Sequence, residues 1–554
     1  MHIGGQIILK LLANDGRKLT DPFGEHVLEP YLRIRSENKS RIESYLSNHF
    51  DPFYQQHGFS SSDMLELILF QSIRICCLVH DIGHPPFSHA VEDVLISHLM
   101  KKVDSPSYED FYNAFRELTN KDVKWGLNAT GRPSDSTGTA GGDLHELVGR
   151  MIAEGISNRL AKQDNLFGAA CLWLSLEISR AKDSPIEAVG MREKLLSCFH
   201  DIISGPVDAD RLDYIERDSV SSGLEFGRFD RNRIISTLRL HFSGTSIKAR
   251  PTTVALSAVE SFFLERYRNQ RWLVFHHNVA RGDVAVARAI DVLLRVWFND
   301  ALLPTAAQAR LREVLQDRRI SLLWEIFRNG YDFSADAALR FSMCDETWMF
   351  GVFREIDAVL TSYFDPDCLD LAVLKACLGM ICRREKTGLV SLWKRIEEYS
   401  IFSERFRESF RGKGFDSWLQ KNSIKRENSA AEFANKVLST ILRPRVKTFG
   451  SLPVLQAIEK RLFQDTDSVL LLRFSRFVAK TPFELIDPQR QRLIDISLLS
   501  TLVAQLDQIW LNDIRLHAFL VPREGHKIAM SDLAERIGSG LPSALMQVIR
   551  EFKI

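Results

Sequence analysis

A dense apolar stretch that ends at a proline pair constrains the fold of this chain more than any other feature. Between Ser62 and Val79, apolar side chains recur so closely that the stretch predicts a helix buried on most sides. Pro85 and Pro86 then stop simple continuation of that helix, because proline has no amide proton and disfavours helical backbone in the preceding residue. A helical pattern resumes at Phe87. We therefore predict two helices joined by a sharp corner.

The remainder of the 554-residue chain favours a mostly α-helical protein. Helical patterns dominate, and the segment Thr237–Ile247 is the best candidate for a β-hairpin. Hydrophobic residues make up 45% and charged residues 26%, which suits a soluble globular protein and argues against general disorder. We expect a core over residues 1–300, which includes a mobile glycine-rich loop at 126–142. Residues 301–554 are expected to form a helical C-terminal region with oligomer contacts.

Charge and cysteine content bear on the partners and the compartment. The 72 basic and 71 acidic residues give a net charge of +1, so the surface as a whole is not tuned to nucleic acid, although local basic patches are possible. The eight cysteines lack the spacing of a disulfide framework or a zinc knuckle, so we expect reduced thiols. The N-terminal stretch resembles neither a signal peptide nor a membrane span. A cytoplasmic protein without a membrane partner is therefore expected.

Metal-ligating residues gather around the predicted corner. His80, Asp81, His84 and His89 lie within ten residues of one another. Imidazole nitrogen and carboxylate oxygen suit Mn²⁺, Mg²⁺, Fe²⁺ or Zn²⁺, and such an ion can polarise phosphoryl oxygens and make hydroxide near neutral pH. We therefore expect one divalent metal ion of one of these kinds. The alternative is a buried His–Asp hydrogen bond without an ion.

A second polar block, residues 208–219, carries several aspartates on a predicted helix. Asp210, Asp213 and Asp218 cannot all face the same way, because neighbours on one helix face lie three or four residues apart. We expect one of them to complete the metal site. The other two would form an ion pair and accept a hydrogen bond from a polar ligand.

Taken together, these blocks resemble the HD-domain deoxynucleoside triphosphate triphosphohydrolases, a family that includes the bacterial dGTPases and the sterile-alpha-motif-and-HD-domain dNTPase. The resemblance covers about residues 1–300 and rests on four blocks in this order: His80–His89, Leu144–Glu146, Asp208–Tyr214 and Ser222–Asp230. It implies a helical HD-domain core with one divalent metal ion. It also implies hydrolysis of dNTPs to deoxynucleoside and tripolyphosphate, with a helical C-terminal extension beyond the core.

The resemblance implies a role for each matching position. In it, His89 protonates the departing 5′-oxygen, and Glu92 orients the ring of His89. The implied metal ligands are His80, Asp81 and Asp210. The implied catalytic group comprises His84, His89, Glu92, His145 and Glu146. Phosphate contact is implied for Arg211, and contact with the deoxyribose is implied for Tyr214 and Asp218.

The chain also departs from the family pattern. The family's first metal-ligand histidine would fall before Met1 and is absent from this sequence. Phe275 and Asn278 stand where the family has a tyrosine and a lysine that contact sugar and phosphate. Arg268 and Arg271 are expected to supply substrate contacts in their place.

These departures leave two alternatives to a dNTP triphosphohydrolase. One is an HD phosphohydrolase that acts on another nucleotide or on a nucleic-acid end. The other is a nucleotide-binding regulatory subunit whose catalysis is impaired by the missing histidine. The expected partners are a dNTP substrate, a nucleotide effector and further copies of the chain in a homo-oligomer. Nucleic acid is possible as a partner, but the net charge does not favour it.

Overall fold

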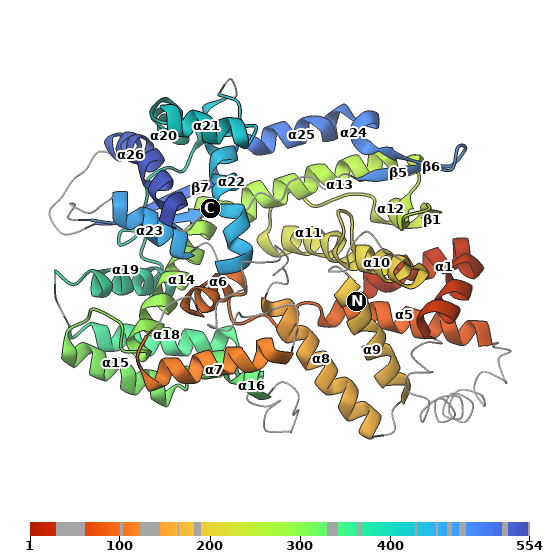
Figure 1. The fold of residues 1–554 in the computed structure, drawn as a ribbon, viewed down its shortest axis with the longest axis horizontal. Helices are drawn as coiled ribbons and strands as arrows, with labels where there is room; N and C mark the ends of the chain where they lie inside the picture. Colours follow the sequence, from red (N-terminus) through yellow and green to blue (C-terminus); the bar gives the residue numbers. More distant parts are fainter. Residues whose placement is uncertain are drawn as a thin grey trace.

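The computed structural model describes most of the chain, namely residues 1–28, 61–99, 103–121, 144–163, 166–181, 190–329, 342–363, 365, 367–426, 429–449, 452–462, 468–475, 483–522 and 530–551. Within these residues the protein is mostly α-helical, as the sequence predicts (Figure 1). The expected glycine-rich loop at 126–142 lies outside the described residues. None of the described helices has both the length and the apolar character needed to cross a membrane.

The described part of the first three hundred residues forms helices and one hairpin. The α-helices are α1 (His2–Phe23), α5 (Ser61–Val79), α6 (His89–Leu99), α7 (Pro106–Lys121), α8 (Leu144–Lys162), α9 (Leu166–Arg180), α10 (Met191–Ser204), α11 (Ala209–Ser222), α12 (Arg231–Ser236), α13 (Leu256–Asn269) and α14 (His277–Trp297). Shorter π- and 3₁₀-helical turns are η1 (Gly24–Leu28), η4 (Thr253–Ala255) and η5 (Gln270–Val274). The hairpin pairs β1 (Leu238–Phe242) with β2 (Ile247–Pro251).

Beyond residue 300, the described residues add further helices and five strands. The helices are α15 (Thr305–Asp317), α16 (Leu322–Asn329), α18 (Glu346–Leu360), α19 (Leu369–Arg383), α20 (Ile396–Ser409), α21 (Lys413–Lys421), α22 (Ala430–Phe449), α23 (Leu452–Leu462), α24 (Ile496–Leu499), α25 (Thr501–Leu511) and α26 (Met530–Glu551). The strands are β3 (Val390–Ser391), β4 (Val469–Phe474), β5 (Glu484–Asp487), β6 (Arg492–Asp495) and β7 (Leu516–Val521).

The predicted corner is present between α5 and α6. Helix α5 ends at Val79, as predicted, but α6 begins at His89, two residues later than the resumed helical pattern indicates. The cause is the backbone of Phe87 and Ser88, whose φ angles of 61° and 49° are left-handed and therefore not helical. His80 and Asp81 follow the end of α5, and His89 opens α6, so the corner carries the ligand-type side chains.

The predicted β-hairpin is also present, although its second strand extends further than the predicted segment. Leu238 pairs with Pro251 and Phe242 pairs with Ile247, so Thr237–Ile247 covers the first strand, the turn and only the first residue of the second strand. Ser243 closes that turn, because its backbone N–H donates to the carbonyl of Ser246 at 2.8 Å.

Sheet structure in the C-terminal region differs from the expectation of helices alone. Strands β3, β7 and β4 form an antiparallel three-stranded sheet in that order, and β5 pairs with β6. All six residues of β7 are buried. A short apolar run of this kind cannot be told from a segment of buried helix by periodicity alone, which is why the sequence did not indicate it.

The hydrophobic core combines side chains from both sides of residue 300. One cluster joins α1, α5, α10 and α13 to Phe483 and to Trp510 near the end of α25, and Figure 1 shows α25 running alongside α13. A second cluster joins α6, α7, α8 and α14 to α15, α16, α18 and α19. The domain boundary near residue 300 stays a prediction, but these clusters make the C-terminal region part of the surroundings of the α5–α6 corner.

Candidate metal and catalytic site

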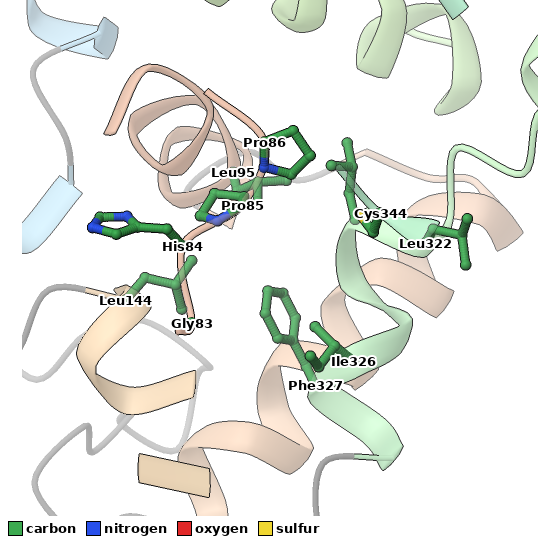
Figure 2. A pocket seen from close by; sticks show the side chains of 11 residues that line it. Gly83, His84, Pro85, Pro86, Leu95, Leu144, Leu322, Ile326, Phe327 and Cys344 are labelled. Atoms are coloured by element: carbon green, nitrogen blue, oxygen red, sulfur yellow. The ribbon is translucent and has the colours of Figure 1, made fainter. Parts of the chain in front are cut away.

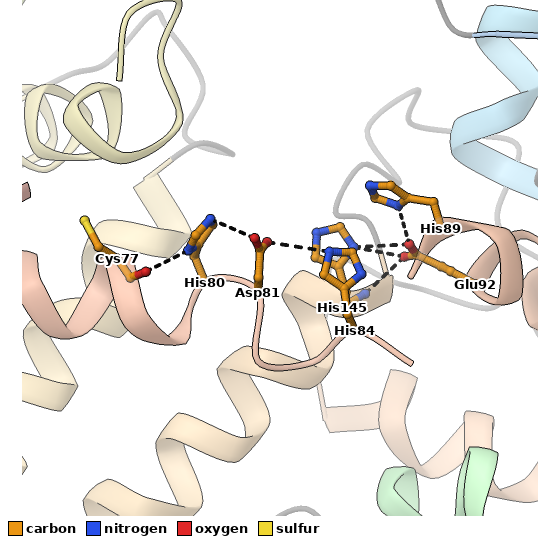
Figure 3. Close-up of polar contacts among 7 residues, drawn as sticks. All are labelled: Cys77, His80, Asp81, His84, His89, Glu92 and His145. Atoms are coloured by element: carbon orange, nitrogen blue, oxygen red, sulfur yellow. Dashed lines mark hydrogen bonds and ion pairs between the residues drawn. The ribbon is translucent and has the colours of Figure 1, made fainter. Parts of the chain in front are cut away.

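Two groups of ligand-type side chains meet at the α5–α6 corner, and Figure 3 shows their members except Asp210. In each group, one nitrogen or oxygen atom from every residue lies within 4.8 Å of the corresponding atoms of the others. The metal group comprises His80, Asp81 and Asp210. The histidine group comprises His84, His89, Glu92 and His145. The structure thus brings together all three predicted ligands and four of the five predicted catalytic residues, whose roles stay predictions.

Within the metal group, hydrogen bonding selects the ring nitrogen of His80 that is available to an ion. Nδ1 of His80 lies 3.1 Å from the backbone oxygen of Cys77, and a carbonyl can only accept, so Nδ1 carries a proton. Nε2 faces the Oδ2 atom of Asp81 at 3.1 Å. A hydrogen bond from one ring nitrogen to a carbonyl is the usual way in which a ligating imidazole is oriented, with the other nitrogen on the metal.

Electrostatics around this group favour a bound cation. Burial alone would raise the pKa of Asp81, but the neighbouring imidazoles of His80 and His84 hold it well below its usual range. Burial raises the pKa of Asp210, and the charge of Asp81 adds to that rise. Burial alone would lower the pKa of His80, but the two carboxylates raise it. A divalent ion on these three atoms would relieve the repulsion between the carboxylates, so the residues fit the metal that the sequence predicts.

The buried carboxylate of Glu92 binds two rings of the histidine group. Its side chain is only 4% exposed and accepts from Nδ1 of His89 at 2.8 Å and from Nδ1 of His145 at 3.2 Å. The backbone N–H of His145 donates to the same carboxylate at 3.1 Å. Burial works against the charge of Glu92, but these hydrogen bonds hold its pKa well below the usual range. Nε2 is therefore the nitrogen of each ring that this carboxylate does not use.

His84 connects the two groups. Its ring stacks on that of His145, with centroids 3.8 Å apart and planes at 15°, and meets His89 edge to face at 4.9 Å. Its Nε2 lies 3.6 Å from Oδ1 of Asp81, beyond a strong hydrogen bond. Its Nδ1 is buried and has no hydrogen-bond partner within the described residues. His84 thus lies between the metal group and the histidine group.

Gly83 lets the corner approach α8 closely enough for His84 and His145 to stack. A Cβ atom at position 83 would lie 2.1 Å from the backbone oxygen of His145 and 2.4 Å from the backbone nitrogen of Gly149. Both distances are far below any van der Waals contact, and neither atom belongs to a side chain that could move away. The close approach of two backbones therefore requires glycine here.

Asp208 fixes the start of α11 and the guanidinium of Arg211. It is the N-cap of that helix, and its side chain accepts from the backbone N–H of Arg211 at 2.7 Å. The same carboxylate pairs with Nη1 of Arg211, which also donates to the carbonyl of Gly205. Burial raises the pKa of Asp208 to about 7, although Arg211 acts against that rise. The cap holds Asp210 and Arg211 at the edge of the site.

The two groups border a polar cavity of about 370 Å³. This volume lies within the range of roughly 300 to 1,000 Å³ that is usual for ligand pockets. Nearly all the predicted metal and catalytic residues line it, including Glu146, and so does Arg211. The cavity wall also contains residues that the sequence did not predict to belong to the site: Cys76, Ser179, His200, Ile203, Ser204 and Asp208. No pattern marks Ser179 or His200, because both belong to ordinary amphipathic helices.

The other predicted substrate-binding side chains do not line this cavity. Tyr214 packs against the hydrophobic core, and Asp218 lies 3.9 Å from the Nε atom of Arg217. Arg268 donates to Glu265 at 2.7 Å. Arg271 donates to the hydroxyl of Tyr267 at 2.7 Å and lies 3.5 Å from a carboxylate oxygen of Asp513. Their role in substrate binding stays a prediction.

No family model matches the chain. An uncharacterized protein of Methanocaldococcus jannaschii is 23% identical over 265 residues, which cover 47% of this chain and 41% of that protein. The uncharacterized protein YwfO of Bacillus subtilis is 27% identical over 215 residues, which cover 38% of this chain and 35% of YwfO. The chain therefore spans less than half the length of either relative.

Two solved structures resemble the chain over most of its length. A phosphohydrolase from Bacteroides thetaiotaomicron VPI-5482 has 15% identity and a TM-score of 0.42, with 82% of this chain and 80% of that chain covered. A hypothetical protein from Aquifex aeolicus has 18% identity and a TM-score of 0.36, with 84% and 79% covered. Likeness at this level does not assign a function, so the chemistry has to be argued from the residues of the site.

Proposed function

We propose that this protein is a metal-dependent phosphohydrolase whose substrate is a deoxynucleoside triphosphate, cleaved to deoxynucleoside and tripolyphosphate. The observation that carries the proposal is the proximity of the His80, Asp81 and Asp210 ligand atoms to the histidine group across one polar cavity. The resemblance of the four sequence blocks to the HD-domain dNTP triphosphohydrolases supports the choice of substrate.

The residues can meet the needs of such a hydrolysis. Water must attack the α-phosphorus in line with the 5′-oxygen, which leaves as the deoxynucleoside hydroxyl and has to gain a proton. A divalent ion, when bound by the metal group, supplies positive charge to the phosphoryl oxygens and acidifies water. His89, held through Nδ1 by Glu92 at 2.8 Å, can give a proton from Nε2 to the leaving oxygen. Arg211 adds positive charge at the cavity edge.

Tripolyphosphate release and metal content together test this proposal. We expect the protein with Mn²⁺ to release tripolyphosphate from dNTPs and to bind the ion through the metal group. Asp210→Asn should lower both the bound Mn²⁺ and the turnover by at least tenfold, because it removes a charged ligand. Asp213→Asn is the matched control, since Asp213 lies on the same helix but pairs with Arg217 outside the cavity. Equal loss in both variants would contradict the assignment.

A second candidate is a phosphohydrolase for another nucleotide or for a nucleic-acid end. It is favoured by the placement of Tyr214 and Asp218, the side chains from which the resemblance implies sugar contacts, outside the cavity lining. Arg268 and Arg271, expected to replace the missing family contacts, also lie outside it. Product analysis with dNTPs, rNTPs and short DNA in parallel separates the two candidates. Release of monophosphate or pyrophosphate, or a preference for rNTPs, would favour the second.

A further inference from the structure

The turn that precedes His89 has unfavourable backbone angles, and residues from a distant part of the chain contact it. Phe87 and Ser88 both have left-handed φ angles, 61° and 49°, which residues with a Cβ atom seldom adopt. Within the turn, the Ser88 N–H donates to the carbonyl of Pro85 at 2.8 Å. Such backbone persists where its surroundings over-determine it, so the contacts around the turn matter.

Those contacts come from α18, which lies more than 250 residues further along the chain. The backbone N–H of Phe87 donates to Oε1 of Glu346 at 3.2 Å, a sequence separation of 259 residues. The ring of Phe87 meets Phe350 edge to face at 5.3 Å and lies 6.1 Å from the fully buried Phe353. One helix therefore fixes both the backbone and the ring of the same residue.

Helix α16 supports the preceding part of the corner. Gly83, His84 and the two prolines face Leu322, Ile326 and Phe327 around a small apolar pocket (Figure 2). Its volume of about 20 Å³ would hold one water molecule at most, and its apolar walls offer such a water few partners. Side chains from residues beyond 300 therefore pack against the corner and shield it from solvent.

The turn is joined directly to the residues of the histidine group. The first turn of α6 bonds back to it: Ala90 N–H donates to the Phe87 carbonyl at 3.2 Å, and Glu92 N–H donates to the Ser88 carbonyl at 3.1 Å. Any rotation of Phe87 and Ser88 toward ordinary backbone angles would therefore displace the start of α6. His89 and Glu92 would move with it, and so would the hydrogen bond between them.

We infer that Glu346 and Phe350 are positioning residues that place His89 for proton transfer by holding the Phe87–Ser88 turn. This inference rests on the proposed function, because it assigns the residues a purpose in the hydrolysis. Neither side chain lines the cavity, so neither is expected to touch substrate or metal. Their effect should appear in the turnover number and leave substrate affinity and metal content unchanged.

The test compares Glu346→Ala, Glu346→Gln and Glu355→Ala in the full-length protein loaded with Mn²⁺. Glu355 is the matched control, because it lies on the same helix and pairs with Arg318 away from the corner. We expect Glu346→Ala to lower kcat about fivefold to tenfold, as for the loss of one hydrogen bond, with KM and bound Mn²⁺ unchanged. Glu346→Gln keeps an acceptor oxygen and should recover most of the activity. Phe350→Ala should act like Glu346→Ala.

Hydrogen–deuterium exchange of the peptide that spans residues 85–92 provides a readout that needs no activity. We expect faster exchange in Glu346→Ala and Phe350→Ala than in Glu355→Ala or the unmodified protein. Unchanged exchange in both variants, or faster exchange without any loss of kcat, would overturn the inference. A protein without hydrolytic activity would refute the proposed function, and the exchange data would still decide whether α18 holds the turn.

Discussion

Gly83→Ala tests the close approach of the corner to α8 most directly. The added methyl would lie 2.1 Å from the backbone oxygen of His145, 2.4 Å from the backbone nitrogen of Gly149 and 2.9 Å from Cβ of Val148. Overpacking a well-filled site costs about 1 to 3 kcal/mol when side chains can adjust. Two of the three atoms here belong to the backbone of a buried helix, so we expect a loss near the upper end, about 3 kcal/mol.

Gly282→Ala on α14 is the control for this substitution. A Cβ atom at position 282 meets nothing within 4 Å, and alanine in a helix interior is about 0.5 to 1 kcal/mol more favourable than glycine. Urea unfolding should therefore give opposite signs for the two variants. Gly83→Ala should also lose activity at temperatures where it is folded, because the stacking of His84 on His145 is displaced. A Gly83→Ala protein with unchanged stability and turnover would refute the claim of close backbone contact.

Three further predictions concern buried charge. Glu92→Gln should cost about 2 to 4 kcal/mol, because it leaves two imidazoles without their carboxylate, and thermal scans should show it. The pKa of Glu92 is held below its usual range, so the ionised carboxylate stabilises the folded protein fully above about pH 4.3 and progressively less as pH falls further. Thermal scans of Glu92→Gln should lack this part of the acid dependence that the unmodified protein shows. Mn²⁺ affinity from calorimetry should weaken as pH falls through the raised pKa of His80, because its Nε2 must lose a proton to bind the ion. Arg288→Met should cost about 3 to 5 kcal/mol, because it leaves the buried Glu459 without its cation, and adding Glu459→Leu should restore part of the stability in urea, since the Leu472 N–H then loses its acceptor.

The corner could be predicted because its causes are local. The apolar run before Val79 and the prolines at 85 and 86 act on their own neighbours, so their effect can be derived from the sequence. The delayed start of α6 could not be derived, because it depends on the contacts of Phe87 with α18 across 259 residues. Nothing in the local sequence favours two successive left-handed residues that both carry side chains.

The metal-ligating residues of the site could be predicted, because their side-chain chemistry can be read from the sequence. The three imidazoles and one carboxylate within residues 80–89 indicate a metal site, but only the resemblance joined Asp210 to them. The structure places one ligand atom from each of His80, Asp81 and Asp210 within 4.8 Å of the others. The wall of the cavity was not predictable. Ser179 and His200 line it because α9 and α10 pack beside α5, and a sequence pattern does not specify which polar side chain of a helix faces an internal space.

The arrangement of the corner explains why the C-terminal region cannot be treated as a separate extension. Two turn residues of the corner have unfavourable backbone angles, and burial disfavours the charge of Asp210 at its edge. Both costs have to be offset by packing, and the first 300 residues provide only part of it through Gly83 against α8. The remainder comes from α16 and α18, whose apolar side chains share one core cluster with α6 and α8. Loosening α18 should therefore impair the histidine group before it impairs the metal group, because His80 and Asp81 follow α5 directly and do not depend on the Phe87–Ser88 turn.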